Sequence, residues 1–105
     1  NDCLSVFRRL GNLRYEAMIL HETSLNHLAT DNPLESERIT QKTLAIFRQL
    51  EDRLNYAYNM RHLGDVYQKM GKADQRDKAW QEAKEIATFL NHHHLLQQIE
   101  KRISA

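Results

Sequence analysis

The chain has 105 residues and carries 15 Lys and Arg against 14 Asp and Glu, so its formal net charge is +1, with both signs interspersed along its length. This length supports one domain at most, and charges mixed this evenly argue against a nucleic-acid or anionic-membrane surface, which needs clustered cations. A single cysteine, Cys3, excludes an internal disulfide and a CxxC pair and points to the cytoplasm, and no apolar run approaches the roughly 18–20 residues of a membrane-spanning helix.

The apolar residues recur at three-to-four spacing throughout, with only one proline and three glycines among them. This pattern predicts an all-helical protein. The expected helices, in chain order, span Asp2–Leu10, Leu13–Thr30, Pro33–Leu50, Leu54–Met70, Ala73–Leu90 and His93–Ile103. Because the chain opens at Asn1 directly in this pattern and without a methionine, we expect it to be a segment of a larger protein.

Short turn signals separate the expected helices. Gly11-Asn12 and Glu51-Asp52 are short enough to force antiparallel neighbours. Asp31 or Asn32 can cap the helix that begins at Pro33, where the missing N–H of proline costs nothing. Gly71 is predicted to stop the helix before it in a left-handed conformation.

The sequence repeats itself with a period of about 40 residues. The segment Val6–Asn12 reappears as Ile46–Asp52, and a weaker third copy follows at Ile86–His92. A period in this range indicates a solenoid, because a hairpin of two amphipathic helices must cover its second apolar face with a neighbouring hairpin. We therefore expect one all-α domain over residues 1–105, an α-α superhelix of about six antiparallel helices. Its repeats would span about 13–51 and 54–90, flanked by half-repeats at 2–10 and 93–103.

Residues 60–83 carry a family motif, with Met60, Leu63, Gly64 and Tyr67 in the spacing M-x2-L-G-x2-Y, then Arg76, Trp80 and Ala83 on the next helix. This motif resembles the tetratricopeptide repeat. The resemblance implies that Gly64 lets two helices approach closely, that Tyr67 and Trp80 fill the space between them, and that Ala83 keeps the next contact tight. Arg76 departs from the pattern, where a small residue is expected, as does Thr88, where a proline is expected.

The 40-residue period and the sequence of residues 45–86 resemble the tetratricopeptide arrays of bacterial signal-transduction ATPases and of transcription activators of the maltose-regulator type. This resemblance implies a cytoplasmic interaction or sensor module in a signalling or transcription-regulating protein. It covers about residues 4–103.

Histidines are the only residues that suggest chemistry. Consecutive helical residues point about 100° apart, so His92–His94 cannot converge on one metal ion in a helix, and we interpret the run as a polar turn. His21 and Glu22 are offset from His62 by one residue beyond the repeat period, and we expect this offset to place them on different faces. General acid–base catalysis needs groups within hydrogen-bonding reach. We therefore predict no enzyme activity, no catalytic residues, no cofactor and no metal site.

The aromatic residues are expected to fill the core, since they stand at packing positions. These residues are Phe7, Phe47, Tyr67, Trp80 and Phe89.

The first helix of each hairpin in a stacked array lines a concave surface. The residues expected to face this groove are Tyr58, Arg61, Asp65, Gln68 and Lys69 from the second hairpin, and Met18, His21, Leu25, Leu28 and Ala29 from the first. One wall is polar and one is apolar, which suits a peptide that offers a hydrophobic anchor and a charged group. We expect a protein or peptide partner and no direct contact with nucleic acid.

Self-association is the alternative function, because about two and a half repeats leave apolar edges uncovered. The open edge around Cys3, Phe7 and Leu10 would then be the surface of a homodimer.

Overall fold

The computed structural model describes residues 2–105, and this part of the chain forms five helices and no strand. The helices are α1 (Asp2–Ala29), α2 (Pro33–Gln49), α3 (Arg53–Lys69), α4 (Ala73–Phe89) and α5 (His93–Ile103). The fold is therefore all-α, as the spacing of apolar residues predicts. The expected count of six helices is wrong, because the first two expected helices are one continuous helix, α1.

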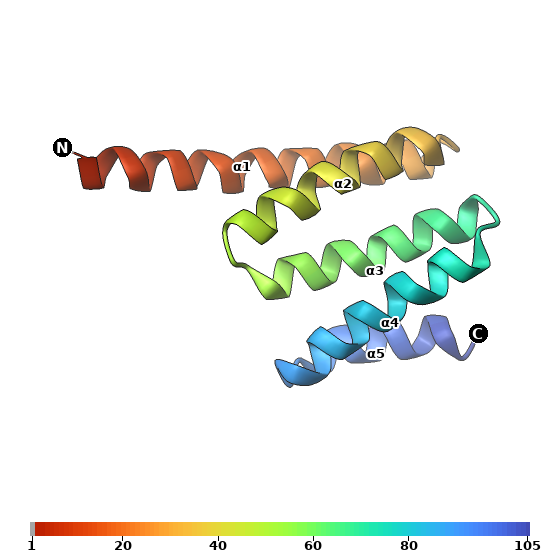
Figure 1. The fold of residues 1–105 in the computed structure, drawn as a ribbon. Helices are drawn as coiled ribbons and strands as arrows, with labels where there is room; N and C mark the ends of the chain where they lie inside the picture. The colour runs from red at the N-terminus through yellow and green to blue at the C-terminus, as the bar shows by residue number, and fades with distance from the viewer. Residues whose placement is uncertain (1) are drawn as a thin grey trace.

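The predicted break at Gly11-Asn12 does not occur in this structure, and both residues lie inside α1. Glycine and asparagine disfavour a helix interior by only about 1 kcal/mol or less relative to alanine. A local conformational preference this weak ends a helix only when tertiary contacts also favour a reversal of the chain. Here the first part of α1 extends beyond the other helices (Figure 1), with nothing folded back upon it.

The four turns between the described helices share one design. The residues in the left-handed region are Asp31, Glu51, Gly71 and Asn91, with φ between 55° and 74°. In each turn, the N–H of the left-handed residue and the N–H of the next residue donate to carbonyls of the last helical turn, which is the Schellman arrangement. The predicted left-handed stop at Gly71 and the predicted turn at Glu51-Asp52 are confirmed.

The helix starts differ in how they are capped. Asp52 accepts a hydrogen bond from the backbone N–H of Asn55 at 3.0 Å, and His92 accepts one from Leu95 through Nδ1 at 3.3 Å. Asn32 occupies the cap position of α2 but makes no side-chain capping bond, while Pro33 stands in the first turn as predicted.

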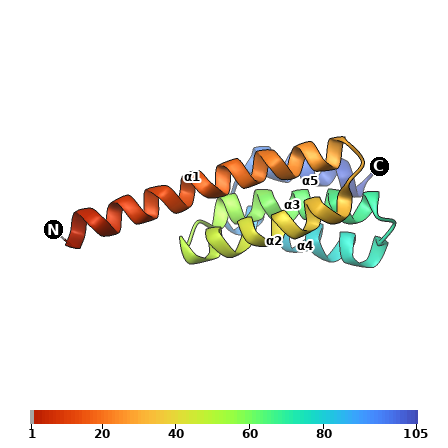
Figure 2. The ribbon, with the colours of Figure 1, turned by 90° about the horizontal axis from the view of Figure 1, so that it is seen from above.

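The helices form two layers. Helices α1, α3 and α5 lie in one layer, and α2 and α4 lie in the other, with each helix antiparallel to the next in the chain (Figures 1 and 2). Side-chain contacts join neighbours within the first layer, from His21 on α1 to His62 on α3 and from Asp65 on α3 to Arg102 on α5. This layer carries the groove described below.

The apolar core is centred on the contact between α3 and α4. A Cβ added to Gly64 would lie 2.1 Å from Cδ1 of Trp80, so the indole packs directly on the α3 backbone. The indole Nε1 donates to the carbonyl of Arg61 at 3.2 Å. Tyr67 and Ala83 are buried in the same core cluster, which agrees with what the motif of residues 60–83 implies.

Two of the five aromatic residues expected in the core are on the surface. Phe7 is 73% exposed and Phe89 is 75% exposed. Phe7 lines a shallow hollow with Gln49, Leu50 and Glu51 at the turn between α2 and α3. Phe89 is two positions out of phase with Phe47, because the residue forty positions after Phe47 is the buried Ala87, and two positions correspond to about 200° around a helix.

Candidate functional site

A shallow groove runs across the ends of α1, α3 and α5. Its first part has a volume of about 490 Å³ and is lined by Leu25, Leu28, Ala29, Asp65, Gln68 and Lys69. Its second part has a volume of about 350 Å³ and is lined by Asp65, Gln68, Lys101, Arg102 and Ala105. Because Asp65 and Gln68 line both parts, the two hollows form one surface, which we call the α1/α3/α5 groove.

The structure brings six of the ten predicted groove residues together. Leu25, Asp65, Gln68 and Lys69 line the groove, and Leu28 and Ala29 extend its apolar wall. The other four do not line it. Met18 is exposed nearer the start of α1, and the rings of Tyr58 and His92 meet edge to face with centroids 5.7 Å apart.

Arg61 and His21 lie beneath the surface and not in the groove itself. The nitrogens Arg61 Nε and His21 Nδ1 are both buried and have no hydrogen-bond partner among the described residues. Burial lowers the pKa of His21, and burial together with the charge of Arg102 lowers the pKa of Arg61. Their spacing along the chain placed them on the groove side of their helices, but both residues are partly buried and neither lines the groove.

Asp65 is held by the arginine of another helix. Arg102 donates from Nε to Asp65 Oδ1 at 2.7 Å and from Nη2 to Asp65 Oδ2 at 3.0 Å, which is the bidentate geometry of a strong ion pair. Arg61 Nη1 approaches the same carboxylate at 3.6 Å. Two guanidinium groups thus share one carboxylate, so Asp65 anchors α5 to α3 and does not present a free negative charge to a ligand.

The accessible charge in the groove is positive. Lys101 is exposed on α5, and Lys69 on α3 reaches only Asp31, at 3.9 Å, in a pair whose two side chains are both exposed. An ion pair of this kind contributes little and competes poorly with a ligand. The groove therefore offers an apolar wall from α1 and a cationic rim from α3 and α5.

A second group of polar side chains lies between α1, α2 and α3. Ser24 Oγ lies 2.7 Å from Ser36 Oγ, 2.8 Å from Thr40 Oγ1 and 2.9 Å from His62 Nε2. The expectation that the one-residue offset keeps His21 and His62 from converging is wrong, because their rings meet edge to face with centroids 5.4 Å apart. In parallel neighbouring helices, the side that faces the next helix is opposite to the side that faces the previous one. Residues that meet therefore occupy non-equivalent positions of the repeat.

This cluster is closed to solvent. The exposed fraction of Ser24 is 0% and that of His62 is 1%. Burial, and to a smaller extent the neighbouring His21, lowers the pKa of His62 to about 4. A serine beside a neutral histidine has the pairing of a nucleophile and its base, but no substrate reaches the hydroxyl in this enclosed position. The cluster fixes how α1, α2 and α3 pack.

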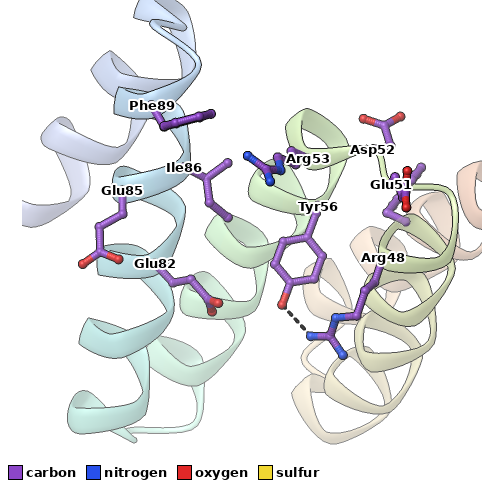
Figure 3. A pocket seen from close by; sticks show the side chains of 10 residues that line it. Arg48, Glu51, Asp52, Arg53, Tyr56, Glu82, Glu85, Ile86 and Phe89 are labelled. Atoms are coloured by element: carbon purple, nitrogen blue, oxygen red, sulfur yellow. Dashed lines mark hydrogen bonds between the residues drawn. The ribbon is translucent and has the colours of Figure 1, made fainter.

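Another hollow of the described chain was not anticipated from the sequence. It lies where the end of α2, the start of α3 and the end of α4 meet, and its volume is about 730 Å³ (Figure 3). Arg48 Nη2 donates to the Tyr56 hydroxyl at 2.8 Å, and the guanidinium of Arg53 lies 5.3 Å from the ring centre of Phe89. Glu82 and Glu85 line the hollow from α4, and Glu82 extends toward the side of Tyr56 (Figure 3). The sequence signal that could have revealed this site is the position of Phe89, which stands two residues beyond the equivalent of Phe47 in the 40-residue period.

The sequence predicts a turn at the histidine run, but only His92 precedes α5, and His93 and His94 are the first residues of that helix. His92 caps that helix, and His94 Nε2 lies 3.0 Å from Gln98 Nε2. Within residues 2–105, no group of His, Cys, Asp and Glu side chains is arranged to hold a metal ion. Over the same residues, the helices lack the combination of length and apolar character that crossing a membrane requires.

A comparison with protein-family models finds no match, and a comparison with curated proteins finds no relative. The fold and the groove define this chain as an all-helical protein, with helices in two layers joined by Schellman turns at regular intervals.

Proposed function

We propose that this chain is a tetratricopeptide-like helical module that binds a protein or peptide segment in the α1/α3/α5 groove. The observation that carries the proposal is the convergence of residues 25–29, 65–69 and 101–105 on one surface with an apolar wall and a cationic rim. Such a surface suits a short segment that combines a hydrophobic anchor with an acidic group.

Two further observations support a repeat architecture. Helices α2, α3, α4 and α5 begin at residues 33, 53, 73 and 93, so each hairpin occupies 40 residues. Gly64, Tyr67, Trp80 and Ala83 pack together as the tetratricopeptide motif requires. A module of this kind serves within a cytoplasmic signalling or transcription-regulating protein, where it recognises a partner by shape and charge without catalysis or a cofactor.

The test uses peptides selected against the chain from a random library, with affinity measured by fluorescence anisotropy. The double variant Lys69→Glu/Lys101→Glu reverses the rim charge and should weaken binding of acidic peptides about tenfold, roughly 1.4 kcal/mol. The matched control Lys42→Glu/Lys78→Glu makes the same charge change at exposed positions of α2 and α4, in the other layer. Equal weakening in both variants, or none in the first, would show that the groove is not the binding surface.

Self-association is the second candidate. Leu4, Phe7 and Leu10 are exposed on α1, and together they form an apolar edge that a second copy could cover. Light scattering coupled to size exclusion, at increasing protein concentration, tests this function. A dimer that Phe7→Glu abolishes would support it, and a monomer at every concentration would exclude it.

A further inference from the structure

The four turns of the described chain are spaced by 20 residues, and one more interval leads back to Gly11-Asn12. The left-handed residues are Asp31, Glu51, Gly71 and Asn91. Each is followed by a cap residue and then by the start of a helix. Gly11, Asn12 and Leu13 stand at the same three positions one interval earlier, yet in the structure all three are helical.

Gly11 has no structural reason to be glycine in the straight helix. A Cβ at Gly11 would meet no atom within 4 Å. The other two glycines do have reasons, because Gly64 makes room for Trp80 and Gly71 is left-handed with φ of 74°. Glycine is the residue best suited to the left-handed position of a Schellman turn, and asparagine is a favoured cap. These two residues therefore fit a turn that the straight α1 does not use.

The segment before Gly11 carries a largely exposed apolar face, although Phe7 and Leu10 line a hollow with Gln49, Leu50 and Glu51. Forty residues later, the same face of α2 is buried. The exposed residues Leu4, Phe7 and Leu10 stand in register with Leu44, Phe47 and Leu50, of which Leu44 and Phe47 are buried. Leu44 belongs to the core cluster with Met60 and Leu63 of α3, whereas Leu4 is exposed at the start of α1.

We propose that α1 is a hinged helix with a second conformation, in which the chain reverses at Gly11-Asn12 and residues 2–10 fold back onto the next turns of α1. In this conformation Gly11 is left-handed, Asn12 caps a shorter helix that begins at Leu13, and residues 2–10 pack as the end of α2 packs on α3. The hinge lies away from the α1/α3/α5 groove, so the inference does not depend on the proposed function.

The contacts of α2 with α3 show which pairs the reversal would form. Thr43 Oγ1 lies 2.9 Å from Asn59 Oδ1, and the residues forty positions earlier are Cys3 and Ile19. Ile19 is 48% exposed in the straight helix and would be covered.

A second contact between α2 and α3 also predicts a pair that the reversal would form. Arg48 donates to Tyr56, and the residues forty positions earlier are Arg8 and Glu16, which have opposite charges. Both transferred pairs are chemically compatible, one apolar and one ionic. The reversal would also bury the apolar edge that the straight form offers to a second copy.

The chain's single cysteine allows a direct test. In the variant Ile19→Cys, the thiols of residues 3 and 19 are separated by about 24 Å along the straight helix, at 1.5 Å per residue. A disulfide requires Cα atoms within about 7 Å, so it forms only when the chain reverses. The variant is equilibrated at low concentration in a glutathione buffer, and the intramolecular disulfide is measured by mass spectrometry. We expect it in a substantial fraction of monomers.

Two controls make the result specific. Met18→Cys places the second thiol one residue away, about 100° around the helix, and should form at least tenfold less disulfide. Gly11→Ala in the Ile19→Cys background fits the straight helix but disfavours the left-handed turn, and should lower the disulfide fraction roughly tenfold. The hinge is overturned by equal disulfide yields in the first two variants, by no effect of Gly11→Ala, or by disulfides that join two chains only.

Discussion

Ser24 Oγ and His62 Nε2 lie 2.9 Å apart, although 38 residues separate them in the chain. Their contact brings together α1 and α3, two helices of the same layer that are not consecutive in the sequence. Ser36 and Thr40 complete the cluster from α2, so polar side chains pack these three helices where α3 and α4 use apolar ones. A buried polar cluster of this kind stabilises the fold only while every member keeps its partner.

Mild acid should therefore destabilise the protein. Because burial lowers the pKa of His62 to about 4, below its ordinary value of 6.5, the folded state favours the neutral ring. Its contribution is present above pH 6.5 and is lost as the pH falls toward 4. Between pH 7 and pH 5 the loss from His62 is about 2 kcal/mol. The free energy of unfolding in urea at the two pH values measures it.

The titration of carboxylates limits the pH range in which a change in stability can be assigned to the histidines. Asp52 and Glu35 have lowered pKa values, so their contributions are lost only below their ordinary values of 3.8 and 4.5. Above about pH 5 the change comes from the histidines, and His62→Gln should remove most of it. A variant that keeps the full pH dependence would exclude His62 as its source.

Gly64→Ala should destabilise the fold, although alanine favours helices. The added Cβ would lie 2.1 Å from Trp80 Cδ1, so either the indole or the α3 backbone must move. Overpacking of this kind costs roughly 1–3 kcal/mol, measured by chemical denaturation. The cost should shrink when Trp80→Leu is present as well, since the smaller side chain leaves room. Equal costs in the two backgrounds would contradict the direct contact.

Phe47→Ala and Phe89→Ala should differ strongly in their effect on stability. Phe47 is 3% exposed and Phe89 is 75% exposed, although both stand near the end of the second helix of a hairpin. Truncation of the buried ring should cost about 3–5 kcal/mol, and truncation of the exposed ring less than about 1 kcal/mol. Thermal melts followed by circular dichroism compare them, and similar losses would show that Phe89 packs in the core.

The cap of α3 should contribute more to stability than that of α2. The Asp52 carboxylate accepts from the backbone of Asn55, whereas Asn32 makes no side-chain capping bond. Asp52→Ala should therefore lower the free energy of unfolding by about 1 kcal/mol, and Asn32→Ala by much less. Chemical denaturation of the two variants measures both losses. A larger loss for Asn32→Ala would contradict the prediction that the α3 cap contributes more.

Local chemistry was enough to predict much of the fold. The spacing of apolar residues indicated helices, and Gly71 and Glu51-Asp52 indicated turns, because helix periodicity and left-handed turn residues act within a few positions of the chain. The contact of Gly64 with Trp80 was implied only by the resemblance to the tetratricopeptide motif, and the structure has this contact. Gly11-Asn12 shows the limit of this reasoning, because the same local signal stands inside α1 in this structure.

Tertiary structure alone decided which side chains meet across non-consecutive helices. The sequence shows His21, His62, Asp65 and Arg102 as separate polar positions, and the structure joins them into an edge-to-face ring pair and a bidentate ion pair. It also leaves only part of the predicted groove accessible. These outcomes depend on the rotation and tilt of each helix against its neighbours, which the whole set of packing contacts determines and which no local pattern encodes.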